Sequence, residues 1–135
     1  MSYRPRRREP PQFFIDRALG SGAIATRLRE AGEIVHVHDD HFKLDEQDEV
    51  WIRDVAARGW IILSKDKEIR KRPNERQALR DARAMAFFLA SGNMTGNEMA
   101  DAFLKALSKM KRLHRKQPAP FVATVTRVGD VSLLS

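Results

Sequence analysis

The chain has 135 residues, with 25 Lys and Arg against 18 Asp and Glu, so its formal net charge is +7. This length fits one ordinary domain, and the absence of cysteine excludes a disulfide framework, a thiolate zinc site and a cysteine nucleophile. No apolar run approaches the roughly 18 residues of a membrane span, so we expect no membrane partner. The positive charge favours a polyanionic partner such as a nucleic acid, although a basic protein without such a partner is the alternative.

The N-terminal segment differs in composition from the rest of the chain. Residues 1–11 contain four arginines and three prolines and no apolar cluster. We therefore expect a basic flexible tail over residues 1–11 and a single domain over residues 12–135. The tail lacks the apolar stretch of a secretory signal, and a cysteine-free chain suits a reducing cytoplasm.

The first elements alternate between short apolar runs and a helical pattern. The run Phe13–Ile15 predicts a buried strand that ends at Asp16. Ser21 is a plausible N-cap for a helix that would stop at Gly32. Ile34–His38 predicts a second strand, which ends at a pair of aspartates.

The pattern then repeats. A second helix is predicted to begin at Asp45, with Trp51 and Val55 on its apolar face. Trp60–Leu63 predicts a third strand, followed directly by Ser64, Lys65 and Asp66. A β-α-β-α-β order with short connections indicates a parallel sheet with right-handed crossovers.

The second half of the chain continues the sheet. We expect a helix over Asn74–Ala82, a strand over Met85–Leu89, and a long helix that begins at the capping box of Thr95 and Glu98. Two further strands, Phe121–Thr126 and Val131–Leu134, surround a turn and predict a C-terminal hairpin.

Acidic residues follow the predicted strands. Asp16, Asp39 and Asp66 each come after a strand, and the carboxyl ends of parallel strands meet at one edge of a sheet. Asp48 lies in the first turn of the second helix, on the same face as Trp51. Clustered carboxylates repel unless a cation bridges them, and hard oxygen ligands favour Mg²⁺ or Mn²⁺. Such ions are the usual equipment for hydrolysing a phosphodiester.

Each of these acids also has a structural alternative. Aspartates commonly end strands because turns favour them. Asp48 could instead act with Asp45 as a helix cap, next to the favourable helix dipole. Glu49 has the spacing of an ion pair with Arg53, and Glu75 could reach the acidic edge or pair with a neighbouring arginine.

The segment between the second strand and the second helix suggests one other metal. It contains His36, His38, Asp39, Asp40 and His41, and His36 and His38 would share one face of a strand. A zinc site is conceivable there. The alternative is that the histidines are half-buried strand residues and the acids belong to a turn.

Basic residues gather in two places. One group follows the third strand, and the other forms a stripe on the last helix. For the stripe, the alternative is an ordinary solvent-exposed face of the helix. A basic rim beside an acidic centre suits a phosphate backbone. The candidate RNA contacts are Arg17, Lys65, Lys67, Arg70, Arg72, Lys105, Lys109 and Arg112.

The order of these motifs resembles the PIN-like domains. The letters FFIDR at residues 13–17 are similar to their first strand and acid, and ATRLREAG followed by IVHVHDDHF is similar to their first helix and second strand. DEVW at residues 48–51 resembles the acid that begins their next helix, and SKDK at residues 64–67 resembles their strand-end acid. The resemblance is closest to the VapC-type toxins. Arg17 departs from the family, where many members carry a second acid.

This resemblance implies a fold and an activity. The fold is a single three-layer α/β/α domain with a mainly parallel central sheet, and the activity is that of a Mg²⁺- or Mn²⁺-dependent endoribonuclease. It implies a toxin that acts on RNA and is neutralised by an antitoxin protein. Separately from the resemblance, the apolar faces of the domain could form a homodimer. The implied metal ligands are Asp16, Asp48 and Asp66, with Glu49, Glu75 and Asp39 as candidates for further acids.

Two other functions stay open on the sequence alone. One is a non-catalytic module that binds RNA or a protein on the same fold. The other is a receiver-like phosphoacceptor domain, which also gathers acids at strand ends but pairs two of them after the first strand. Here Asp16 is followed by Arg17, and no serine, histidine and aspartate pattern indicates a nucleophilic triad.

Overall fold

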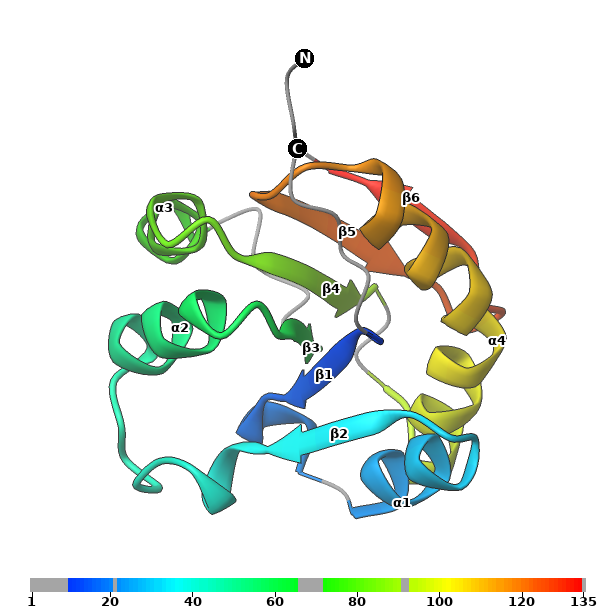
Figure 1. The fold of residues 1–135 in the computed structure, drawn as a ribbon. Helices are drawn as coiled ribbons and strands as arrows, with labels where there is room; N and C mark the ends of the chain where they lie inside the picture. The colour runs from blue at the N-terminus through cyan, green and yellow to red at the C-terminus, as the bar shows by residue number, and fades with distance from the viewer. Residues whose placement is uncertain (1–9, 21, 66–71, 91–92, 135) are drawn as a thin grey trace.

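The computed structural model describes residues 10–20, 22–65, 72–90 and 93–134. These residues form one six-stranded sheet with the strand order β2-β1-β3-β4-β5-β6 (Figure 1). The first five strands are parallel, and β6 pairs antiparallel with β5. The strands are β1 (Gln12–Ile15), β2 (Ile34–Val37), β3 (Ile61–Ser64), β4 (Met85–Leu89), β5 (Phe121–Val125) and β6 (Val131–Leu133).

Helices cover both faces of this sheet. The described helices are α1 (Gly22–Glu30), α2 (Asp48–Ala57), α3 (Pro73–Asp81) and α4 (Gly96–Lys116), with short 3-10 helices η1 (Arg17–Leu19) and η2 (His38–Asp40). In Figure 1, α1 and α4 lie on one side of the sheet and α2 and α3 on the other. The expected three-layer α/β/α fold is therefore confirmed, as are the mainly parallel sheet and the C-terminal hairpin.

Two hydrophobic cores explain the layers. Because side chains alternate along a strand, Phe13 enters the core under α1 and α4 while Phe14 enters the core under α2 and α3. Along β3, Ile61 and Leu63 belong to the first core and Ile62 to the second. All five side chains are almost completely buried, as expected for parallel strands covered on both faces.

Most predicted boundaries agree with the structure within one or two residues; the start of the second helix was wrong by three residues, and two strand boundaries differ by one residue. The second helix begins at Asp48 rather than Asp45, because residues 44–45 form a turn and Gln47 adopts extended N-cap geometry. β2 ends before His38, since its partner β1 ends at Ile15 and offers no further backbone to pair with. Trp60 lies before β3 because its backbone N–H donates a hydrogen bond to the carbonyl of Val55, at the C-terminal end of α2.

Two predictions about elements of the fold fall on residues outside the described ranges. Ser21, the expected cap of α1, is one of them. The other is most of the N-terminal tail, so the division into residues 1–11 and 12–135 stays a prediction, although β1 does begin at Gln12. In the described part of the chain, no helix has the length and apolar character needed to cross a bilayer.

The turn between β5 and β6 packs tightly against α4. Gly129 in this turn has φ +87°, and a Cβ atom there would lie 2.6 Å from the Cβ of Lys105 and 2.9 Å from its carbonyl carbon. Lys109 also forms an ion pair with Asp130 at 3.0 Å. The hairpin is therefore fixed to α4 by a contact that only glycine permits.

Gly129→Ala should lower the free energy of unfolding by about 2–4 kcal/mol, because it combines a strained φ with overpacking against the α4 backbone. Gly32→Ala is the matched control, since Gly32 also has a positive φ of +93° but has open space around it. The control should cost only about 1–2 kcal/mol of backbone strain. Urea unfolding followed by circular dichroism measures both, and equal losses would contradict the close contact.

Candidate active site

A cavity of about 440 Å³ opens where β1 and β3 end, between η1, η2 and the N-terminal turns of α2 and α3. It contains four acidic and three basic side chains. Its lining consists of Asp16, Arg17, Ala18, His38, Leu44, Glu46, Asp48, Trp51, Lys65, Arg72 and Glu75. The carboxyl edge of the sheet is thus where acids distant in sequence meet, as the strand pattern predicts.

Asp16 connects the ends of two strands. Its backbone N–H donates to the carbonyl of Leu63 at 3.0 Å. Its carboxylate accepts a hydrogen bond from the Ser64 hydroxyl at 2.8 Å and a longer one from the N–H of Ala18 at 3.4 Å. The carboxylate is therefore oriented by β3 on one side and by η1 on the other.

The electrostatic environment of Asp16 opposes its charge. Burial raises the pKa of this carboxyl above its ordinary value of 3.8, and the hydrogen bonds from Ser64 and Ala18 lower it. The neighbouring charge of Asp48 raises the pKa again, whereas His38 lowers it. A buried carboxylate that faces a second one is a group that a bound cation would stabilise.

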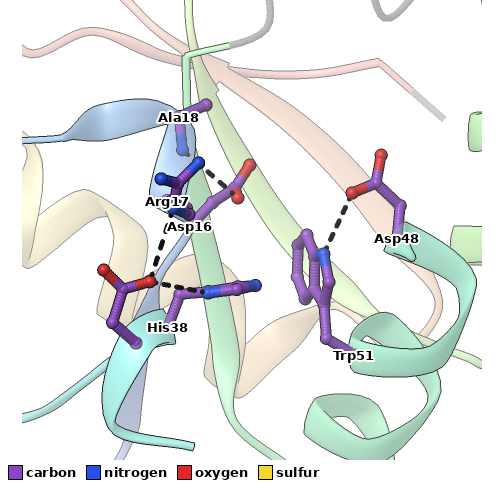
Figure 2. Close-up of polar contacts among 7 residues, drawn as sticks. Asp16, Arg17, Ala18, His38, Asp48 and Trp51 are labelled. Atoms are coloured by element: carbon purple, nitrogen blue, oxygen red, sulfur yellow. Dashed lines mark hydrogen bonds and ion pairs between the residues drawn. The ribbon is translucent and has the colours of Figure 1, made fainter. Parts of the chain in front are cut away.

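Asp48 reaches the cavity from α2. It is the first residue of the helix, and its Oδ1 accepts a hydrogen bond from the indole Nε1–H of Trp51 at 3.0 Å. Figure 2 shows the carboxylates of Asp16 and Asp48 on either side of the space above the Trp51 indole. The expected inward direction of Asp48 thus agrees with the structure, while its alternative role as a cap together with Asp45 does not, because Asp45 lies in the preceding turn.

His38 forms the third side of the cavity, and it contacts its chain neighbour Asp39. The His38 ring is buried, and its Nδ1 lies 3.1 Å from Oδ1 of Asp39. The same oxygen of Asp39 lies 3.6 Å from Nε of Arg17, and both of those side chains are about half exposed. Asp39, a candidate further acid, therefore contacts Arg17 and His38 and does not itself line the cavity.

The remaining candidate acids differ in position. Glu75 lies in the first turn of α3 and lines the cavity, with its Oε2 buried. Glu49 is exposed on α2 and lies outside the lining. The i, i+4 ion pair that the structure shows on α2 joins Asp54 to Arg58 at 2.8 Å, not Glu49 to Arg53 as expected.

The described acids suit a small divalent ion. Asp66, Lys67 and Arg70 lie outside the described residues. Among the residues that the structure describes, no group of three or more candidate ligands is placed to hold a metal. Mg²⁺ typically takes only one or two carboxylates and completes its shell with water and substrate phosphate. The buried Asp16 and the facing Asp48 supply two hard carboxylate donors, so the residues present fit such an ion.

The zinc reading of the histidine segment is not supported by the geometry. His36 stacks on Trp60 with ring centroids 3.6 Å apart, and its Nε2 is hydrogen bonded to Gln12 at 2.8 Å. The alternative, half-buried histidines beside a turn, describes His36 well. His38 belongs to η2 and packs in the aromatic core.

The basic residues separate into two surfaces. Arg17, Lys65 and Arg72 line the cavity. The stripe on α4 lies on the opposite side of the sheet from α2 and α3, and Lys105, Lys109 and Arg112 are not part of the cavity lining. Lys109 and Arg112 instead border a separate groove between α4 and β6.

Comparison with known proteins agrees with this geometry. A family model described as "PIN like domain" matches residues 11–91, more than half of the chain. The chain belongs to the PIN-like domain family. The matched region includes Asp16, Asp48 and Asp66, and the family resemblance expected from the sequence is confirmed.

One relative extends the match beyond the family model. The chain is 30% identical over 117 residues to a protein of Mycobacterium tuberculosis (strain ATCC 25618 / H37Rv) named "Putative ribonuclease VapC45". The aligned region covers 84% of this chain and 84% of that protein. No solved structure gives a significant match.

Sequence reasoning on PIN-like motifs missed several residues that line the cavity or contact its acids. Ser64 was placed only as the end of a strand, and Trp51 only as a core residue, yet each donates a hydrogen bond to a candidate ligand. The i, i+3 spacing of Asp48 and Trp51 was a usable signal for the second contact. Glu46 and Leu44 lie in the loop before α2, and nothing in their spacing indicated that they line the cavity.

Asp16→Asn should raise the free energy of unfolding at pH 7 in metal-free buffer, by up to about 2 kcal/mol. The pKa of Asp16 is raised in the folded protein, so the folded state binds the proton more tightly and loses stability as pH rises through the range above 3.8. The advantage of the variant should therefore shrink as pH falls toward that value.

Urea titrations at several pH values measure this difference. Asp54→Asn, which removes an exposed carboxylate of α2, is the control and should change stability by no more than about 0.5 kcal/mol. A variant that is less stable than the wild type at pH 7 would show that Asp16 does not oppose folding.

Proposed function

We propose that this PIN-like domain is a Mg²⁺- or Mn²⁺-dependent endoribonuclease that hydrolyses RNA phosphodiester bonds. The observation that carries the proposal is the single cavity in which Asp16 and Asp48 meet beside Arg17, Lys65 and Arg72. The printed name of the mycobacterial relative, a ribonuclease, supports the same activity. Because the net charge of the chain is +7, an anionic polymer is a suitable substrate.

Each group of residues has a part in the reaction. Asp16 and Asp48, together with Asp66, would hold the metal, and Glu75 stands at the same cavity as a further acid. A divalent ion held by these residues would supply Lewis acidity, which would activate water and offset negative charge on the reacting phosphate. Ser64 keeps the Asp16 carboxylate oriented. Lys65 and Arg17 line the same cavity and would bind the phosphate of the substrate.

The resemblance to VapC-type toxins extends the proposal to partners. We propose that the chain is the toxin of a toxin–antitoxin pair, that a protein antitoxin neutralises it, and that it acts in the cytoplasm. A homodimer belongs to the same proposal. A non-catalytic RNA-binding or protein-binding module is the competing function, and the cleavage experiment below separates the two.

Asp16→Asn and Asp66→Asn should each lower metal-dependent RNA cleavage by at least about 100-fold while the protein stays folded. The reason is that loss of a metal ligand removes several kcal/mol of transition-state stabilisation. Purified protein is incubated with total RNA in Mg²⁺, in Mn²⁺ and in chelator. Asp54→Asn is the matched carboxylate control and should cleave like the wild type.

Two results would contradict this proposal. Full cleavage by both ligand variants would remove the assigned residues from the chemistry. Metal-independent RNA binding without cleavage, by a folded wild-type protein tested on a wide range of RNA sequences, would favour the binding module.

Lys65→Gln should weaken the binding of RNA of any length, because Lys65 lines the cavity where the reacting phosphate would lie. Its log Kd should also depend less steeply on log salt, by about 0.7 for the lost phosphate contact. The paired change Lys105→Gln with Arg112→Gln, on α4, should weaken binding only of RNA long enough to reach the other side of the domain. Fluorescence anisotropy with short and long RNA, in the Asp66→Asn protein, separates the two surfaces.

Equal effects of the cavity and α4 substitutions on a short RNA would contradict this division of roles.

A further inference from the structure

Trp51 is an unusual core residue because its polar atom faces the candidate active site. Its side chain is only 4% exposed, yet it lines the cavity. Its Nε1–H donates to Oδ1 of Asp48 at 3.0 Å, and Asp48 lies exposed at the first position of α2 (Figure 2). The side chain of the N-cap residue Gln47 makes no hydrogen bond to the helix, so it does not help to hold this turn.

The indole is held in one orientation from two sides. Phe14 of β1 stacks on it with ring centroids 5.3 Å apart and an angle of 30° between the planes. His38 of η2 meets it nearly edge-on, at 5.9 Å and 84°. His38 in turn is anchored through Nδ1 to Asp39 at 3.1 Å. A ring packed in this way cannot rotate freely, so the direction of its N–H is set by the core.

We propose that Trp51 is a positioning residue of the metal site, whose indole N–H fixes the carboxylate of Asp48 so that its other oxygen can meet a divalent cation. This inference rests on the proposed function. Asp48 is otherwise an exposed side chain with several rotamers, and a rigid donor removes that freedom before the cation arrives. Hydrogen bonds that orient metal ligands commonly contribute 10–100-fold in metal affinity or activity.

The N–H of Trp51 also places the positive end of a dipole next to the Asp48 carboxylate. Asp48 and Asp16 face the same cavity, and their charges repel each other. A donor to Asp48 offsets part of that repulsion and does so without occupying the cavity itself. Trp51 therefore holds the Asp48 carboxylate from the cavity wall and leaves the open side of the cavity to substrate and solvent.

The first test compares two buried tryptophans. Trp51→Phe keeps an aromatic ring in the core and removes only the N–H donor and part of the ring. Trp60→Phe is the matched control, because Trp60 is 7% exposed and packs against the same Phe14. Isothermal titration with MnCl₂ measures the affinity of each protein, with circular dichroism to verify that it is folded.

The expected result is a loss of about 10-fold or more in Mn²⁺ affinity for Trp51→Phe and a change within about 2-fold for Trp60→Phe. Wild-type affinity in Trp51→Phe would overturn the inference, and so would an equal loss in both variants, since that would reflect packing alone. If the wild-type protein itself binds no Mn²⁺, the metal-dependent function fails and this inference fails with it. Wild-type binding that Trp51→Phe leaves unchanged removes only the role of Trp51.

A second test does not need a Trp51 substitution, which guards against a variant that fails to fold. The chain has two tryptophans, so Trp60→Phe leaves Trp51 as the only indole fluorophore. Titration with Mg²⁺ should change the fluorescence emission of Trp51 until the site is saturated. The reason is that the cation binds the Asp48 carboxylate, which accepts the hydrogen bond from the Trp51 N–H. Adding Asp48→Ala to this protein should abolish the response. No response to Mg²⁺ at concentrations that saturate the site, or a response that survives Asp48→Ala, would overturn the inference.

Discussion

The hydrogen bond between the Ser64 hydroxyl and the carboxylate of Asp16 joins residues 48 positions apart, at 2.8 Å. It forms only because β1 and β3 are parallel neighbours that end at the same level of the sheet. Burial at this position raises the pKa of Asp16, so the protein retains a carboxylate where ionisation is unfavourable. The helices η1 and α2 and the cations of the cavity together form the environment of this one carboxylate.

Much of the fold could be predicted from the sequence, because the apolar runs of the strands are short and clearly bounded. Phe13–Ile15 and Met85–Leu89 are buried on both faces, and their composition leaves little choice of structure. The start of α2 could not be predicted in the same way. Asp45 and Asp48 are equally suitable by type for the first turn of a helix, and only the turn formed by residues 44–45 decides which of them begins α2.

The candidate site was predictable to a similar degree. The strand-end position of Asp16 and the inward spacing of Asp48 both follow from periodicity, and the cavity brings the two residues together. The contacts that orient them could not be read from spacing in one chain, because Ser64 reaches Asp16 across the sheet and His38 reaches Trp51 from another element. Asp66 and the basic segment after it stay predictions from the sequence.

Charge is distributed on the domain in a way that the net value of +7 does not reveal. Three cations share the cavity with the acids. In the proposed nuclease they would bind phosphate while a metal neutralises the carboxylates. The cations of α4 lie across the sheet, and Lys109 is already paired with Asp130. In the proposed function, this separation would divide the cleavage chemistry and the wider electrostatic attraction of RNA between two surfaces.

The central claim is that Asp16 and Asp48 hold a divalent cation together with Asp66. Anomalous X-ray scattering from a crystal of the wild-type protein grown with Mn²⁺ tests it most directly. The account predicts an anomalous peak in the cavity, within about 2.0–2.3 Å of carboxylate oxygens from Asp16 or Asp48. A crystal in Mn²⁺ at a concentration that saturates binding in solution, with peaks only at other positions and an empty cavity, would contradict it.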